Sequence, residues 1–298
     1  MTSAGRFAPS PSGELHVGNL RTAILAWLFA RSTGRRFLMR VEDLDRARAG
    51  AEAEQLRDLA AIGVTWDGGV VRQTEREPLY AEAIDRLAAA GLTYECFCTR
   101  REIQEAPSAP HAPQGAYPGT CRNLDPAELE FKRTIRPAAI RLRAAVTEWT
   151  VEDQLRGTYT GMVDDFVLRR NDGVTAYNLA VVVDDAAQGV EQVVRGDDLL
   201  SSTPRQSYLA SLLNIPAPEY AHVPLVVNSD GARLAKRDGA VTLADLASAG
   251  LDAGRVRDII LASLGLPAGT LEQALAGFDP AALPRDPWVW PGAVQLGA

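Results

Sequence analysis

The chain has 298 residues, of which 46% are hydrophobic and 23% charged, and its formal net charge is −7. This length can bury a large core in one elaborated domain or two, and no apolar run is long enough to cross a bilayer, so we expect no membrane contact. The acidic balance argues against broad, sequence-independent nucleic-acid binding but leaves room for a local basic surface. Three cysteines, an odd number, and no basic-then-apolar leader predict a reduced, cytoplasmic protein without a disulfide framework.

The first informative stretch predicts a strand, a loop, a helix and a second strand. Gly5–Ala8 is a short apolar run ended by prolines and glycine, and helical spacing follows from about Gly18 to the stop at Gly34. Phe37–Val41 is the second predicted strand. Two strands joined by such a helix form a right-handed parallel βαβ unit, whose helix begins at the carboxyl edge of the sheet. We therefore expect free helix N–H groups to face an anion there.

His16 lies just before this helix and is placed to donate to a phosphate. The loop contains neither a G-x-G-x-x-G nor a P-loop pattern, so dinucleotide and P-loop functions lack support. From the residues alone, an ordinary Pro/Gly-rich connection remains the alternative. Residues 51–62 and 78–90 are predicted to form amphipathic helices that cover the sheet.

The second informative stretch contains all three cysteines: Cys96, Cys98 and Cys121. Thiolates at the two ends of a Pro/Ala/Gly loop at 107–118 suggest tetrahedral zinc, although a buried cysteine pair with a separate thiol is the alternative. Zinc requires a fourth ligand, and chemistry alone nominates His111.

Residues 122–165 form a polar, mixed segment that interrupts the α/β pattern. Within it, Ala139–Arg143 predicts a half-buried strand with its arginines pointing outward. Arg133 and Arg136 add to an arginine-rich face, which is either solvated or in contact with RNA. We expect residues 91–165 to be an insertion between two halves of one domain.

The α/β pattern then resumes. Predicted strands and helices lie at 165–169, 174–185, 191–194, 202–214, 222–227 and 255–264. The strand at 191–194 ends in the charged run 195–198, which indicates either buried salt bridges or a functional strand end. The loop at 228–239 carries Lys236 between glycines, in a chain with few lysines.

Two ordered signatures resemble class I aminoacyl-tRNA synthetases of the glutamate-specific group. RFAPSPSGELHVGN followed by RVEDLD resembles the first signature, and His16-Val17-Gly18-Asn19 occupies the place of its His-Ile-Gly-His motif, with Asn19 departing. Arg233-Leu234-Ala235-Lys236-Arg237 is similar to the second, Lys-Met-Ser-Lys-Ser, and matches it at Lys236. The Cys-x-Cys and Tyr-x-x-x-Cys pattern is similar to the zinc site of the short glutamyl-Q tRNA(Asp) synthetases. This resemblance nominates Tyr117, and not His111, as the fourth ligand.

The resemblance implies a Rossmann-like α/β catalytic domain at 1–90 and 166–240, split by a zinc-bearing insertion at 91–165. A helical segment at 241–298 would follow, with no anticodon-binding domain. The implied activity is ATP-dependent conversion of L-glutamate to glutamyl-adenylate without tRNA, then transfer of glutamate to queuosine in the anticodon of tRNA(Asp). One structural Zn²⁺, Mg²⁺ with ATP and a monomeric state are expected. The alternatives are a glutamyl-tRNA synthetase charging tRNA(Glu) and a non-catalytic, zinc-stabilised RNA-binding paralogue.

The resemblance also implies site residues. The catalytic pair would be His16 and Lys236, and ATP would be bound by His16, Gly18, Asn19 and Lys236. L-Glutamate would be bound by Arg6, Phe7, Ala8, Pro9, Ser10, Glu42, Tyr177 and Arg195. The metal ligands would be Cys96, Cys98, Tyr117 and Cys121.

Overall fold

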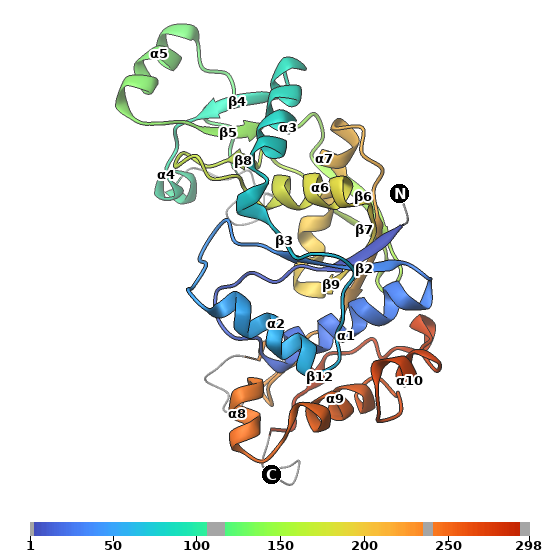
Figure 1. Ribbon diagram of the computed structural model, residues 1–298. Helices are drawn as coiled ribbons and strands as arrows, with labels where there is room; N and C mark the ends of the chain where they lie inside the picture. The colour runs from blue at the N-terminus through green and yellow to red at the C-terminus, as the bar shows by residue number, and fades with distance from the viewer. Residues whose placement is uncertain (1–2, 106–116, 235–240, 293–298) are drawn as a thin grey trace.

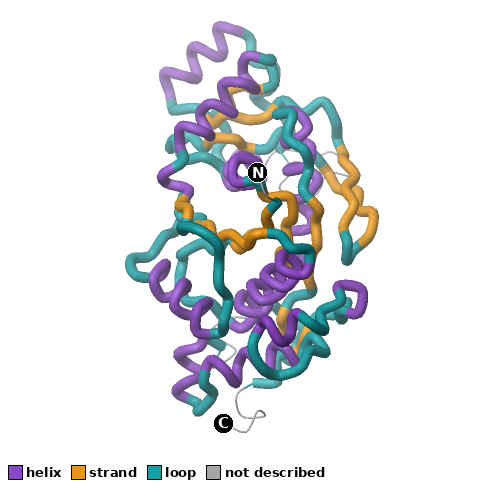
Figure 2. The backbone as a smooth tube through the Cα atoms, turned by 45° about the vertical axis from the view of Figure 1, so that its right-hand side comes forward, coloured by secondary structure: helices purple, strands orange, loops and turns teal. Residues whose placement is uncertain are grey.

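The computed structural model describes residues 3–105, 117–234 and 241–292. Its centre is a seven-stranded sheet in the order β3-β2-β1-β9-β10-β6-β7, with helices on both faces (Figures 1 and 2). Neighbouring strands are parallel except for the β6–β7 hairpin. The strands are β1 (Ala4–Phe7), β2 (Arg36–Val41), β3 (Val71–Arg72), β6 (Glu148–Asp153), β7 (Gly157–Met162), β9 (Val190–Gly196) and β10 (Glu219–Val223). This mixed α/β arrangement is the predicted Rossmann-like fold.

The predicted βαβ unit is confirmed: β1 and β2 pair in parallel on either side of α1 (Val17–Ser32) in the chain. Most of α1 is buried, because the helix packs on the sheet with one face and on the C-terminal helices with the other. Gly34 has φ +69°, a left-handed conformation that glycine adopts at little cost, and the chain turns there toward β2.

Helices cover both faces of the sheet (Figure 1). One side carries α1, α2 (Ala51–Ala61), α8 (Leu243–Ser248), α9 (Ala253–Ala262) and α10 (Leu271–Leu275), whose leucines and isoleucines join one core. The other carries α3 (Glu77–Ala89), α6 (Tyr177–Gln188) and α7 (Thr203–Leu212), which form a second core. The helices predicted at 51–62 and 78–90 are thus confirmed as α2 and α3. None of the helices in the described residues is both long and apolar enough to cross a membrane.

A smaller antiparallel sheet, β4-β5-β8, projects from the main body at the top of Figure 1. It comprises β4 (Thr93–Cys96), β5 (Ala139–Leu142) and β8 (Val167–Arg169), and α4 (Arg100–Glu105) and α5 (Pro126–Ile135) belong to the same region. The pairing does not follow the division at 91–165. Strands β6 and β7 lie inside that range but join the main sheet, and β8 lies beyond it but pairs with β5. Strand partners are set by burial between distant segments, which local pattern does not report.

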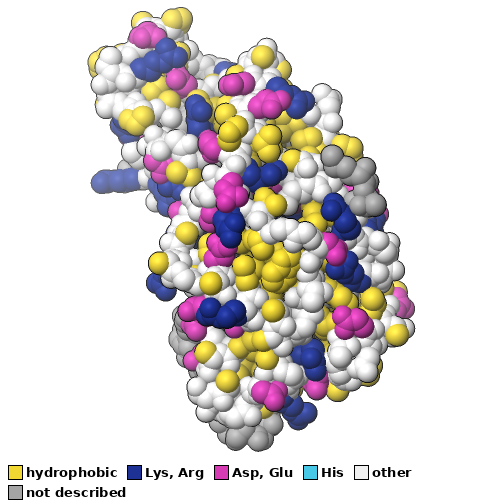
Figure 3. Space-filling model, in the orientation of Figure 1, with side chains coloured by type: hydrophobic (Ala, Val, Ile, Leu, Met, Phe, Trp, Pro, Cys, Tyr) yellow, Lys and Arg dark blue, Asp and Glu magenta, His cyan; other side chains and the backbone are white. Residues whose placement is uncertain are grey.

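The charged side chains on the surface are mixed in sign. On the face seen in Figure 3, Lys and Arg side chains are interspersed with Asp and Glu and do not gather into one large basic patch. Two arginines of the segment that the sequence marks as arginine-rich have carboxylate partners: Arg133 pairs with Glu95 at 2.8 Å and Arg136 with Glu102 at 3.2 Å. The structure therefore favours a solvated face for these two arginines.

Two expectations about single elements are wrong. The strand predicted at 222–227 is two strands, β10 and β11 (Val226–Val227), because Pro224 between them has no N–H to donate to a ladder. β11 pairs with β12 (Trp288–Val289), which the sequence pattern did not predict. Arg141 does not point outward: it is 6% exposed, and its guanidinium donates to the Asp165 carbonyl at 2.7 Å.

Candidate active site

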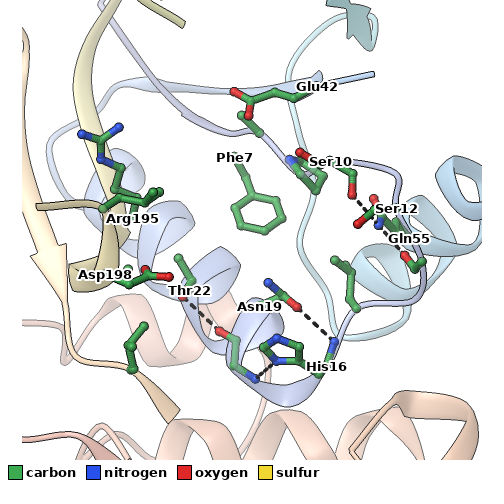
Figure 4. A pocket seen from close by; sticks show the side chains of 18 of the residues that line it. Phe7, Ser10, Ser12, His16, Asn19, Thr22, Glu42, Gln55, Arg195 and Asp198 are labelled. Carbon is green, nitrogen blue, oxygen red and sulfur yellow. Dashed lines mark hydrogen bonds between the residues drawn. The ribbon is translucent and has the colours of Figure 1, made fainter. Parts of the chain in front are cut away.

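A cavity of about 640 Å³ lies at the carboxyl ends of β1, β2 and β9, the edge where open parallel sheets bind ligands. Eleven of the predicted substrate residues line it: Arg6, Phe7, Ala8, Pro9, Ser10, His16, Gly18, Asn19, Glu42, Tyr177 and Arg195. Glu42 and His16 lie at opposite ends with Phe7 between them (Figure 4). The predicted Lys236 lies outside the described residues. The cavity therefore has two chemically distinct ends.

His16 is the N-cap of α1 and is held there by a reciprocal pair of bonds. Its Nδ1 accepts the N–H of Gly18 at 3.1 Å, and its own N–H donates to Asn19 Oδ1 at 3.1 Å. In a neutral imidazole whose Nδ1 accepts, the proton is on Nε2. Burial, followed by the charge of Arg233, lowers the pKa of His16 to about 4, against the opposing effect of Asp198. At neutral pH His16 is therefore an uncharged donor.

This cap changes how the helix start can bind an anion. The first four N–H groups of α1 already have acceptors: Val241 O for Val17, His16 Nδ1 for Gly18, and His16 O for Asn19 and Leu20. The expectation of free helix amides facing an anion is therefore wrong, because the Val241 carbonyl and the side chain and carbonyl of His16 together accept all four N–H groups. His16 Nε2–H is the donor that this end of α1 presents.

Gly18 is required by the position of that imidazole. A Cβ at residue 18 would lie 2.9 Å from His16 Cε1 and 3.0 Å from its Nδ1, closer than carbon atoms approach in folded proteins. Any larger side chain at residue 18 would therefore displace the His16 donor.

The loop before His16 is fixed by Gln55 of α2, whose Nε2 donates to the carbonyls of Ser10 at 3.0 Å and Gly13 at 2.6 Å.

A buried cluster of arginine and carboxylate side chains lies next to the Glu42 end of the cavity. Arg6 is 4% exposed, and its Nε donates to Asp185 Oδ1 at 3.2 Å. Arg40, fully buried beneath it, contacts Asp185 at 2.8 Å, Glu42 at 3.6 Å and Asp184 at 3.7 Å. Burial raises the pKa of the Glu42 carboxyl, although Arg40 and Arg6 oppose this. Burial also acts to raise the pKa of Asp185, but Arg40 and Arg6 outweigh it and hold that pKa below its ordinary value.

Arg195 enters the same end from β9 and is 5% exposed. It donates to three uncharged side chains: His222 Nε2 at 3.0 Å, Thr203 Oγ1 at 2.8 Å and Tyr177 Oη at 3.4 Å. Within the described parts of the chain it forms no ion pair. Its positive charge is therefore available to an anion in the cavity, whereas the charge of Arg6 is shared with Asp185.

The second signature lies beside the first at the His16 end of the cavity. Arg233, which occupies the place of the first lysine of Lys-Met-Ser-Lys-Ser, lines the cavity and pairs with Asp198 at 2.6 Å. Thr242, just after the second signature, forms a β-bridge with His16. Two segments that are distant in sequence thus lie side by side around one cavity.

The three cysteines form a second candidate site in the projecting region. The sulfur atoms of Cys96, Cys98 and Cys121 lie within 4.8 Å of one another, and all three cysteines are free of disulfides. The Tyr117 hydroxyl faces them, 3.3 Å from Cys96 Sγ and 3.7 Å from Cys98 Sγ. This donor set of three sulfurs and one oxygen around a common point fits a tetrahedral metal such as zinc. The rival ligand His111 lies outside the described residues.

Arg141 explains part of this geometry. Its guanidinium stacks on the Tyr117 ring, with its central carbon 3.7 Å from the ring centroid. The backbone N–H of Cys121 also donates to the Tyr117 oxygen at 2.8 Å. Burial raises the pKa of the Tyr117 phenol, so a phenolate here requires the charge of a bound cation.

Comparison with known proteins relates this chain to a family of tRNA synthetases. The family of class I tRNA synthetases (E and Q), catalytic domain, matches residues 4–272. Glutamyl-Q tRNA(Asp) synthetase of Nocardia farcinica is 66% identical over 287 residues, covering 96% of this chain and 92% of that protein. This chain belongs to the glutamyl-Q tRNA(Asp) synthetase family. Another relative of that name, from Cutibacterium acnes, is 55% identical over 271 residues and covers 89% of this chain and 77% of its own length.

A solved structure supports the fold of this class I synthetase. The glutamate tRNA ligase from Elizabethkingia meningosepticum, in complex with its amino acid, superposes with a TM-score of 0.85 at 26% identity. The match covers 99% of this chain and 68% of that one. The predicted Rossmann-like class I fold is thus confirmed.

Sequence reasoning missed several residues that shape the cavity of this family member. Gln55 occupies a polar position of an amphipathic helix and carries no local signal of function, whereas Arg40 interrupts an apolar strand. Asp184 and Asp185 end a helical pattern in the same unremarkable way. An arginine inside a five-residue apolar strand was the one available hint, because a buried charge requires a partner.

Proposed function

We propose that this chain activates L-glutamate with ATP and then transfers the glutamyl group to queuosine in the anticodon of tRNA(Asp). The observation that carries the proposal is the pairing of Arg6 and Arg195 with Glu42 at one end of the cavity and His16 at the other. The relatives named glutamyl-Q tRNA(Asp) synthetase and the glutamate-bound ligase support it.

Glutamate has two carboxylates and one ammonium group, and the Glu42 end has matching charges. Arg195 would bind one carboxylate with the charge that its uncharged neighbours leave available, and Arg6 would assist. Glu42 would accept from the ammonium group. Tyr177, 38% exposed at the cavity, would contact the same substrate.

In the first step, a glutamate carboxylate oxygen attacks the α-phosphorus of ATP. A bond forms between that oxygen and phosphorus, and the bond to the bridging oxygen of pyrophosphate breaks. Because no covalent enzyme intermediate is needed, positioning and charge stabilisation supply the rate. His16 would donate Nε2–H to a phosphate oxygen, and Lys236 would neutralise charge developing on the triphosphate. Mg²⁺ bound with ATP would supply further neutralisation.

In the second step, a hydroxyl of queuosine attacks the adenylate carbonyl and AMP leaves. The zinc site, formed by the three cysteines and Tyr117, would hold the projecting region together and take no part in the chemistry. We place this activity in the cytoplasm, where ATP and tRNA are found, and assign it to a monomer.

ATP–pyrophosphate exchange without tRNA tests the first step. We expect exchange that depends on glutamate and is not supported by glutamine or aspartate. Loss of exchange in Arg195→Gln, with the variant still folded, would agree with the assigned site. Absence of glutamate-dependent exchange in the wild-type chain would refute tRNA-independent activation.

The acceptor is tested separately with radiolabelled glutamate. We expect label on queuosine-bearing tRNA(Asp) even after its 3′-terminal adenosine has been removed, and none on tRNA(Asp) with guanosine at that anticodon position. Labelling of tRNA(Glu) that disappears with its 3′-terminal adenosine would instead identify a glutamyl-tRNA synthetase.

A further inference from the structure

A line of buried polar side chains crosses three neighbouring strands and ends at Arg195. Strands β9, β10 and β6 are adjacent in the main sheet. Arg195 of β9 is in direct register with His222 of β10, and Asp153 is the last residue of β6. The three side chains therefore follow one another across the sheet.

The contacts along this line are short and fully enclosed. The side chains of His222 and Asp153 are 0% exposed, and His222 Nδ1 lies 2.5 Å from Asp153 Oδ2. On its other side, His222 Nε2 accepts from Arg195 Nε at 3.0 Å. Thr203, at the start of α7 and also 0% exposed, accepts from Arg195 Nη2 at 2.8 Å. These two buried acceptors, together with the Tyr177 hydroxyl, hold Arg195.

The chemistry of the donors determines the tautomer of His222. The Asp153 carboxylate accepts the N–H groups of His222, Leu155 and Arg156, at 2.9–3.2 Å. A carboxylate can only accept, so His222 Nδ1 must carry the hydrogen that it donates to Asp153. In the neutral ring, Nε2 then carries no hydrogen, and its lone pair accepts from Arg195, whose guanidinium can only donate. Burial lowers the pKa of the His222 imidazolium, which favours this neutral form.

A reversed tautomer would place an Nε2–H against the Nε–H of Arg195. Two donors cannot share a bond, so this Nε2–H would have only Thr203 Oγ1, 3.1 Å away, to donate to. Arg195 would then lose His222 as an acceptor, and its guanidinium would rotate or shift away. Because a bound carboxylate needs donors fixed in direction, such a shift weakens substrate binding without touching the ATP end of the cavity.

We propose that Asp153 and His222 are positioning residues that orient the guanidinium of Arg195 toward a carboxylate of the substrate amino acid, with Thr203 as a second support. This inference rests on the proposed glutamate activation. It also gives β6 a part in the substrate site, although β6 lies within residues 91–165, which the sequence predicts to be an insertion.

Asp153→Asn is the sharpest test, because it keeps the size of the side chain. The substituted amide would direct its oxygen to the backbone N–H groups and its NH₂ group to His222 Nδ1, and so reverse the tautomer. We expect the KM for glutamate in pyrophosphate exchange to rise about tenfold or more, because the charge-assisted bond between Arg195 and the substrate carboxylate is lost. The KM for ATP should stay within about twofold. Glu152→Gln is the matched control, since Glu152 is the preceding, exposed carboxylate of β6 and contacts Thr158.

Two further variants separate orientation from folding. His222→Gln keeps an amide oxygen that can accept from Arg195, so its KM for glutamate should lie between those of the wild type and His222→Leu. Thr203→Val removes one acceptor at nearly constant volume and should raise the same KM. If Asp153→Asn does not fold, these variants decide. A purely structural role would change kcat and both KM values together.

The outcomes are distinguishable from failure of the proposed function. If the wild type exchanges pyrophosphate but all folded variants keep the wild-type KM for glutamate, the positioning role is overturned and glutamate activation stands. If the wild type does not exchange but binds glutamate by calorimetry, the same variants are compared by Kd. If the wild type does neither, both proposals fall.

Discussion

Replacing Arg40 with methionine would remove a fully buried guanidinium that contacts three carboxylates beside the cavity. The nearest is Asp185 at 2.8 Å, followed by Glu42 at 3.6 Å and Asp184 at 3.7 Å. At an effective dielectric constant of about 20, one pair at the closest of these distances contributes about 6 kcal/mol. Part of this is offset, because the variant no longer desolvates Arg40. We therefore expect the free energy of unfolding to fall by about 3–5 kcal/mol, as when one partner of a buried pair is removed.

The loss should depend on pH in a definite direction. Burial already raises the pKa of Glu42, and Arg40 opposes that effect. Without Arg40 the carboxyl pKa values rise further. The loss in the free energy of unfolding is therefore greatest at pH values above these pKa values, and it becomes smaller as pH falls and the carboxylates take up protons. Urea titrations at about pH 7.5 and about pH 5.5 would measure this difference.

The matched control is Arg72→Met. Arg72 pairs with Glu52 at the surface, with its side chain 38% exposed, so its loss should cost within about 1 kcal/mol. A loss for Arg40→Met no larger than for this control, or one that does not diminish at the lower pH, would refute the assignment of the cluster as a buried, charge-balanced support.

Three other predictions concern the two sites. Gly18→Ala should raise the KM for ATP by displacing His16, whereas Gly13→Ala, whose Cβ would have no atom within 4 Å, should not; equal effects in exchange assays would contradict the contact. Tyr117→Phe should lower zinc content measured by metal analysis; unchanged content together with zinc loss in His111→Ala would reverse the ligand assignment. Because burial lowers the pKa of His16 from 6.5 to about 4, the free energy of unfolding should rise with pH across that interval, and His16→Asn should reduce the slope.

Local pattern was sufficient for much of the fold. The strand-helix-strand unit at the N-terminus, the helices α2 and α3 and the grouping of three cysteines all follow from spacing and turn residues within short windows. The two signatures carried further information, because each names residues that the family brings to one site. Eleven predicted substrate residues line the same cavity for that reason.

Long-range pairing decided the rest. Local pattern showed neither that β6 would join β10 nor that Arg141 would turn inward onto Tyr117, since both depend on burial between distant segments. The helix start is a similar case: the residues predict a helix that begins near His16, but only the folded geometry shows that His16 and Val241 occupy its first amides and leave His16 Nε2–H as the donor.

The sequence by itself therefore determined which residue types gather at the carboxyl edge of the sheet, because strand and helix periodicity is local. The tertiary structure decided which of their charges remain available to a substrate. Arg6 shares its charge with Asp185, and Arg195 keeps its own among uncharged partners. The physical reason is that electrostatic balance is set by neighbours within a few ångströms in space, which segments far apart in the chain supply.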